Sequence, residues 1–166
     1  MASWAEFSPT RLLRVLIAHG VDFVAVGGIA MIAHGSARFT QDLDICYASD
    51  DANLDVLGAA LIELEATLRG VVDGLPFVPD GRALRRTTIL TLATREGPID
   101  LLPQPSGAPT YHELRQRATR FDLDGVGVLV ASLDDLEAMK RAAGRPKDQI
   151  DLEEIETIRQ LLERSG

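Results

Sequence analysis

Hydrophobic and polar positions along this chain switch between helical and strand periods, a pattern typical of a mixed α/β protein. Leucines at helical spacing predict a long helix over residues 52–68 with one buried face. Runs of β-branched and other apolar residues over 22–26 and 43–47 predict central strands covered on both faces. The expected order is α-β-α-β-α-β-β-α-β-β-α-α, and a length of 166 residues favours a single domain.

Capping and turn residues mark the other expected elements. Ser8-Pro9 begins the first helix, Asp124-Gly125 forms a hairpin turn, and Ser132 caps a later helix. Residues 70–82, rich in Gly, Pro and Asp, are expected to form a loop. Helices are predicted over 10–19, 29–33, 111–117 and 133–143, with a last one ending near 163. Strands are predicted over 87–94, 99–102, 119–123 and 126–130, and a turn over 95–98.

The most informative stretch runs from Phe23 to Ile45 and combines a glycine pair with an aspartate pair. Gly27 and Gly28 allow a tight turn from strand to helix, and a helix N-terminus offers free N–H groups to an anion. Asp42 and Asp44 lie on the same side of the next strand, because side chains alternate along a strand. Two adjacent carboxylates repel unless a cation lies between them, and Mg²⁺ prefers such oxygen ligands. The stretch therefore predicts a metal site beside a phosphate-binding turn.

The order of residues from Gly27 to Asp44 is Gly-Gly-x-Ala-x-x-x-His-Gly-x-x-Arg-x-Thr-x-Asp-x-Asp. It resembles the signature of the DNA polymerase β-type nucleotidyltransferase superfamily, especially the minimal nucleotidyltransferases and AbiEii-like toxins of bacteria. The resemblance implies a polymerase β-like fold, with a mixed β-sheet flanked by helices. It also implies transfer of a nucleoside monophosphate from a nucleoside triphosphate (NTP), dependent on Mg²⁺ or Mn²⁺, with release of pyrophosphate.

A third carboxylate, Asp100, lies inside the apolar segment 98–102, where a lone buried charge would be costly. The resembling families place a third metal ligand on a strand next to the aspartate pair. Asp42, Asp44 and Asp100 are therefore the expected metal ligands, and the resemblance also gives the third carboxylate a part in activating the attacking hydroxyl. The alternative is an edge-strand aspartate that faces water.

Three further residues are candidates for contacts to the nucleotide. Lys140 lies in a segment, residues 139–151, that resembles a C-terminal motif of AbiEii-like proteins, in which a lysine points at the nucleotide. Arg38 and Thr40 precede the aspartate pair, where a cation and a hydroxyl can reach phosphate oxygens. Arg38 could equally pair with Asp42 or Asp44.

Structural roles are the alternative for several of these positions. The glycine pair could serve the fold alone, and His34 is expected to pack or cap a helix. Asp148 lies in the first turn of a helix, where its negative charge is stabilising. The remaining expectations are a buried Cys46 and a solvated acidic face formed by Asp151, Glu153, Glu154 and Glu156.

Composition excludes several classes of protein. The one cysteine rules out an internal disulfide and a cysteine-based zinc site, and the three histidines form no zinc motif. No apolar run approaches the roughly 20 residues that span a bilayer, so no membrane association is expected. The first residues lack the layout of a signal peptide, and a cytoplasmic location fits best.

Charge distribution bears on the acceptor of the predicted transfer. The net charge is −8, but residues 82–120 carry seven arginines against three acidic residues. This basic segment could receive a polyanion such as tRNA, or it could be an ordinary solvated surface.

An RNA (tRNA) or protein hydroxyl is the leading acceptor, within a toxin–antitoxin or phage-defence system that includes an antitoxin or toxin partner. The alternative is a catalytically inactive module that binds a nucleotide or a partner protein. A small-molecule acceptor would usually require an additional domain.

Overall fold

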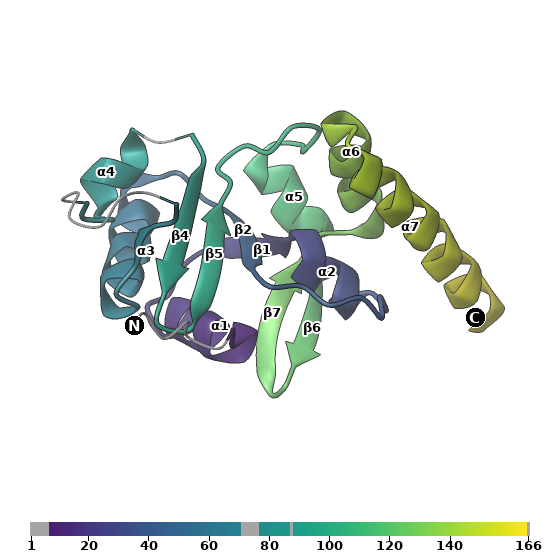
Figure 1. The fold of residues 1–166 in the computed structure, drawn as a ribbon, viewed down its shortest axis with the longest axis horizontal. Coiled ribbons are helices and arrows are strands. Elements are labelled where there is room, and N and C mark those ends of the chain that lie inside the picture. The colour runs from purple at the N-terminus through teal and green to yellow at the C-terminus, as the bar shows by residue number, and fades with distance from the viewer. Residues whose placement is uncertain (1–6, 71–76, 87, 166) are drawn as a thin grey trace.

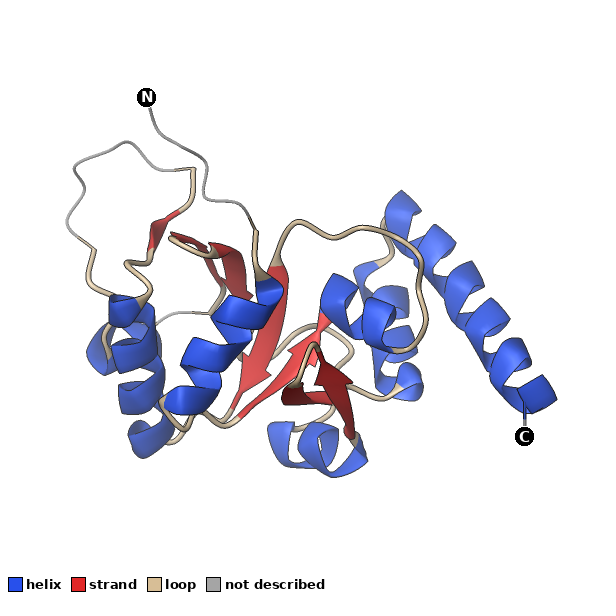
Figure 2. Ribbon diagram, turned by 90° about the horizontal axis from the view of Figure 1, so that it is seen from below, coloured by secondary structure: helices blue, strands red, loops and turns tan. Residues whose placement is uncertain are grey.

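The computed structural model describes residues 7–70, 77–86 and 88–165. These residues form a mixed seven-stranded sheet of order β3-β4-β5-β2-β1-β7-β6 with helices packed around it (Figures 1 and 2). The strands are β1 (Phe23–Val26), β2 (Leu43–Tyr47), β3 (Thr67–Leu68), β4 (Leu90–Thr94), β5 (Gly97–Leu101), β6 (Thr119–Leu123) and β7 (Val126–Val130). The helices are α1 (Pro9–Ala18), α2 (Gly27–Ala33), α3 (Asp51–Glu63), α4 (Gly81–Arg85), α5 (Tyr111–Arg117), α6 (Leu133–Ala143) and α7 (Pro146–Ser165).

The register of the central strands determines where polar side chains meet. β2 lies between β1, to which it is antiparallel, and β5, to which it is parallel. In this register Asp44 lies opposite Val26 on one side and opposite Asp100 on the other. Because α2 begins directly after Val26, the glycine pair starts beside Asp44. Segments far apart in the sequence are thus brought to one place by strand pairing.

Side-chain caps and an apolar core explain why the predicted elements form. Ser8, Asp50 and Ser132 each accept a hydrogen bond from a backbone N–H in the first turn of α1, α3 and α6. Leu92 of β4 and Ile99 and Leu101 of β5 are fully buried. The predicted mixed α/β class is confirmed.

The prediction of one helix over residues 52–68 is wrong in its last turns. α3 ends at Glu63, Glu65 adopts a positive φ of 56°, and Thr67 and Leu68 pair with β4 as β3. The leucine spacing continues past the end of the helix because two leucines beyond it also contact the core. Leu64 is the buried C-cap residue of α3, and Leu68 packs against the core from β3.

Two other local predictions also differ from the structure. Gly81–Arg85, which falls partly in the expected loop over 70–82, is the helix α4, and Asp80 caps it by accepting a hydrogen bond from Ala83 N–H at 2.9 Å. Residues 71–76 of that loop lie outside the described residues. Gly97 and Pro98 belong to β5, so the predicted four-residue turn is shortened to two residues.

The C-terminal helix α7 is only partly attached to the rest of the molecule. It packs against α6 and buries Asp148, Asp151, Ile155 and Ile158. Its C-terminal end extends away from the body (Figures 1 and 2). None of the described helices is both long and apolar enough to cross a bilayer.

Candidate active site

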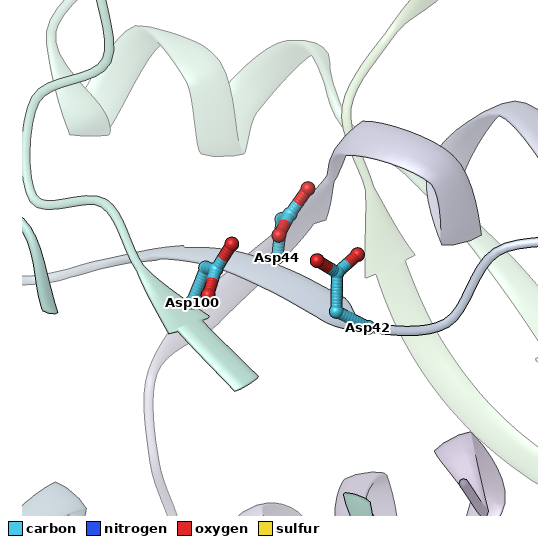
Figure 3. A group of neighbouring side chains, drawn as sticks. All are labelled: Asp42, Asp44 and Asp100. Atoms are coloured by element: carbon cyan, nitrogen blue, oxygen red, sulfur yellow. The ribbon is translucent and has the colours of Figure 1, made fainter. Parts of the chain in front are cut away.

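Three carboxylates converge where β2 and β5 run side by side. Asp42 lies just before β2, Asp44 on β2 and Asp100 on β5, and an oxygen of each lies within 4.8 Å of the others (Figure 3). The parallel pairing of Asp44 with Asp100 explains this proximity. β5 is an interior strand between β4 and β2, so Asp100 is not the edge-strand aspartate of the alternative interpretation.

The electrostatics of Asp44 suit a cation. Burial, together with the charges of Asp42 and Asp100, raises the pKa of Asp44 to about 7. Its Oδ1 atom is buried, and within the described part of the chain it accepts no hydrogen bond. A buried, unsatisfied carboxylate oxygen is costly unless a positive charge approaches it. Together with the oxygen ligands of Asp42 and Asp100, it fits the ligand preference of Mg²⁺ or Mn²⁺.

Both glycines of the motif permit close packing at this place. Gly27 has a φ of +67°, and a Cβ atom there would lie 2.0 Å from Asp44 Oδ2. A Cβ atom on Gly28 would lie 2.6 Å from Thr40 Oγ1. The Thr40 hydroxyl in turn donates to the backbone oxygen of Asp42 at 3.2 Å. The glycine pair and Thr40 therefore help to position the carboxylates, in addition to the phosphate contacts that were predicted for them.

The other two predicted nucleotide contacts, Arg38 and Lys140, line a cleft together with the three carboxylates. Acidic side chains of α7 form ion pairs with both of them. Asp151 accepts from Arg38 with one oxygen, and its other oxygen lies 2.8 Å from Lys140 Nζ. Arg38 also lies 3.8 Å from Glu154, and it makes no ion pair with Asp42 or Asp44 among the described contacts. The prediction that Asp151 belongs to a solvated face is wrong, because its side chain is 11% exposed and bridges two cations.

Comparison with solved structures identifies the fold. The lincosamide antibiotic adenylyltransferase LnuA, in its lincomycin-bound form, matches with a TM-score of 0.62 and 14% identity over 92% of this chain and 99% of that chain. The enzyme ANT(2″)-Ia, in complex with adenylyl-2″-tobramycin, matches with a TM-score of 0.52 and 15% identity over 93% and 95%. The chain has the polymerase β-like nucleotidyltransferase fold. No family model and no curated protein matches its sequence.

Sequence reasoning missed Arg69, which forms an ion pair with Asp100, one of the three carboxylates. Its guanidinium pairs with Asp100, and its backbone N–H donates to Thr91 at 3.0 Å. Burial raises the pKa of Asp100, and Arg69 opposes that shift. Because Thr91 lies opposite Asp100 in the β4–β5 register, Arg69, Thr91, Asp100 and Asp44 form a row across the sheet. The sequence pattern predicted that Arg69 follows a helix, so it did not indicate that Arg69 pairs with Asp100.

A cleft of about 360 Å³ surrounds the carboxylates in this nucleotidyltransferase fold. Its wall includes Gly28, Lys140, Arg145 and Lys147, and Phe39 at the rim is fully exposed. Sequence reasoning had not singled out Phe39 or Lys147, although both lie within the segments that carried the resemblance.

Several residues have the structural roles that were expected. His34 hydrogen-bonds the backbone oxygen of Ala131 at 2.8 Å, and its ring packs edge-on against Phe121. Cys46 is buried in β2. Asp148 is fully buried in the first turn of α7, and hydrogen bonds from Arg145 lower its pKa to about 2.

The arginine-rich segment is largely neutralised by neighbouring acids. Among the seven arginines of residues 82–120, four form ion pairs with acidic side chains of the described residues: Arg85, Arg95, Arg115 and Arg117. This arrangement favours the interpretation of an ordinary solvated surface over a polyanion-binding patch.

Replacing Asp44 with asparagine is expected to stabilise the metal-free protein, and more so at high pH. The folded-state pKa of Asp44 is raised from 3.8 to about 7. The contribution of Asp44 to stability is therefore greatest below pH 4 and is lost as the pH rises through 7, because the buried carboxyl group must then ionise. Urea denaturation in EDTA should show a gain for Asp44→Asn that is about 2 kcal/mol larger at pH 8 than at pH 5. An equal gain at both pH values would contradict this electrostatic account.

Proposed function

We propose that this protein is a divalent-metal-dependent nucleotidyltransferase that transfers a nucleoside monophosphate from an NTP to an acceptor hydroxyl. The observation that carries the proposal is the convergence of Asp42, Asp44 and Asp100 at the start of α2, with one Asp44 oxygen buried and lacking a donor among the described residues. Such a site serves phosphoryl-type transfer, in which catalysis is mainly positioning and charge stabilisation.

Each side chain has a role in this reaction. Asp42 and Asp44, joined by Asp100, would hold a divalent metal, which would supply charge stabilisation at the phosphate oxygens of the NTP. Asp100 accepts the proton of the attacking hydroxyl as its oxygen bonds to the α-phosphorus. The bond from that phosphorus to the bridging oxygen breaks, and pyrophosphate leaves with the electron pair. Gly27, Gly28, Arg38, Thr40 and Lys140 line the cleft where the phosphates would be oriented.

The acceptor in this proposal is a hydroxyl of a macromolecule, either a protein or tRNA. Among the described residues, the sheet face that carries Asp100 is open beside it: Thr67 and Thr91 are exposed, and Figure 1 shows no helix across β4 and β5. An open face suits a large acceptor, whereas small ligands are usually enclosed. The ion-paired arginines favour a protein over tRNA. A cytoplasmic toxin–antitoxin or phage-defence role, with a cognate partner, remains part of this proposal.

A small-molecule acceptor is the second candidate, and the fold neighbours favour it. LnuA is described with lincomycin bound, and ANT(2″)-Ia with an adenylylated tobramycin. The match covers 99% of the LnuA chain, so the expectation that such an acceptor requires an additional domain does not hold for that protein. A catalytically inactive module is less compatible with three assembled carboxylates, because losing one of them would be the simplest route to inactivity.

One experiment separates these possibilities. The protein is incubated with Mg²⁺ and each α-labelled NTP in turn, together with bulk tRNA, cell lysate, or a panel of lincosamides and aminoglycosides. The expected result is label in a protein band, with tRNA or a small molecule as the other productive outcomes, and no label with Asp42→Ala/Asp44→Ala. Equal labelling by the double variant would remove the assigned role of these aspartates. No label with any NTP or acceptor would support the inactive module.

A further inference from the structure

Most positive charge in the cleft is already neutralised by acidic side chains of α7. Arg38, Lys140 and Arg145 each form an ion pair with at least one of three carboxylates: Asp148, Asp151 and Glu154. Three cations and three carboxylates leave this network with no net charge. The network therefore adds little long-range attraction for a triphosphate, and its cations must exchange partners to bind one.

Lys147 differs from these three cations. It lies in the first turn of α7, is exposed, and lines the same cleft as the glycine pair and the carboxylates. Within the described residues, no hydrogen bond or ion pair occupies its ammonium group. It is thus a positive charge in this cleft that requires no prior rearrangement before binding an anion.

The position of Lys147 indicates which part of the nucleotide it meets. Lys140 is 14% exposed, whereas Lys147 is exposed, and both line the same cleft. Lys147 therefore lies nearer the mouth of the cleft than Lys140 does. A metal at the carboxylates would hold the reacting phosphate, so a cation nearer the mouth of the cleft would meet the outer phosphates.

We infer that Lys147 binds the β- or γ-phosphate of the NTP and so selects triphosphates over monophosphates at this site. The inference rests on the proposed nucleotidyl transfer, and it assigns a substrate contact to a residue for which the resemblance predicted no role. The contact is charge-assisted, and exchanging lysine for an uncharged residue should weaken binding of an NTP selectively.

The test is nucleotide binding by calorimetry with Mg²⁺ and non-hydrolysable α,β-methylene analogues of the four NTPs. For the analogue that binds best, Lys147→Gln should raise Kd at least about tenfold and Lys147→Arg no more than about threefold. Binding of the corresponding monophosphate should change less than about threefold in both variants. Arg164→Gln, the same loss of charge at the exposed far end of α7, should leave both affinities unchanged.

A second measurement does not depend on any variant folding correctly. The chain contains only two lysines, so acetylation by an amine-reactive ester can be followed at each of them by mass spectrometry. The Mg²⁺-bound analogue should slow acetylation of Lys147 at least fivefold, whereas the monophosphate should not.

The outcomes distinguish a failure of this inference from a failure of the proposed nucleotidyl transfer on which it rests. If the wild-type protein binds none of the four analogues, the proposed function fails and the inference fails with it. If the analogue binds but Lys147→Gln retains full affinity, or Lys147 is not protected, the role of Lys147 alone is overturned.

Discussion

Asp42→Asn is expected to reduce nucleotidyl transfer by at least about a thousandfold. The substitution keeps the size of the side chain but removes one of three charges that would hold the metal, and such an ion contributes several kcal/mol of charge stabilisation. Initial rates of pyrophosphate release with the productive NTP and acceptor provide the measurement. Glu156→Gln is the matched control, because it makes the same charge change on an exposed face of α7 and should retain full activity. Activity of Asp42→Asn within threefold of wild type would exclude it as a metal ligand.

Gly27→Ala should damage both stability and metal binding. The added methyl would lie 2.0 Å from Asp44 Oδ2, and the φ of +67° is unfavourable for alanine. We expect a stability loss of about 2–4 kcal/mol by urea denaturation. We also expect Mn²⁺ affinity, measured by calorimetry, to fall at least about tenfold, a change of roughly 1.4 kcal/mol, because Asp44 must move.

Gly20→Ala separates the two causes of this effect. Gly20 has a similar φ of +75°, but among the described residues no atom beyond its own and its two chain neighbours' lies within 4 Å of the position of its Cβ. It should therefore lose only about 1 kcal/mol, from the backbone alone, and bind Mn²⁺ normally. If Gly27→Ala and Gly20→Ala behaved alike, the close approach of Gly27 to Asp44 would have no functional importance.

Local signals predicted much of the fold and the centre of the candidate site. Turn and cap residues act over a few positions, and they located the β6–β7 hairpin and helix α6 at their observed bounds. Side-chain alternation nominated Asp42 and Asp44, and the resemblance to nucleotidyltransferases, together with the position of an aspartate in an apolar strand, nominated Asp100. The structure brings these three together because β2 and β5 pair in parallel.

Interactions between distant segments were beyond such local reasoning. The pairing of Arg69 with Asp100 depends on the strand order β3-β4-β5, which no local pattern specifies. Asp151 has acidic neighbours in sequence and resembles a surface residue until α7 packs on α6 and brings Lys140 to it. Leucine spacing likewise could not distinguish the end of α3 from the start of β3, because both bury leucines.

Anomalous diffraction from crystals grown with Mn²⁺ and a non-hydrolysable NTP tests the central claim most directly. The account predicts a manganese peak within coordination distance of carboxylate oxygens of Asp42 and Asp44, with the triphosphate in contact with the same ion. A bound nucleotide whose manganese lies away from these carboxylates, or the absence of any peak between them at saturating Mn²⁺, would contradict it.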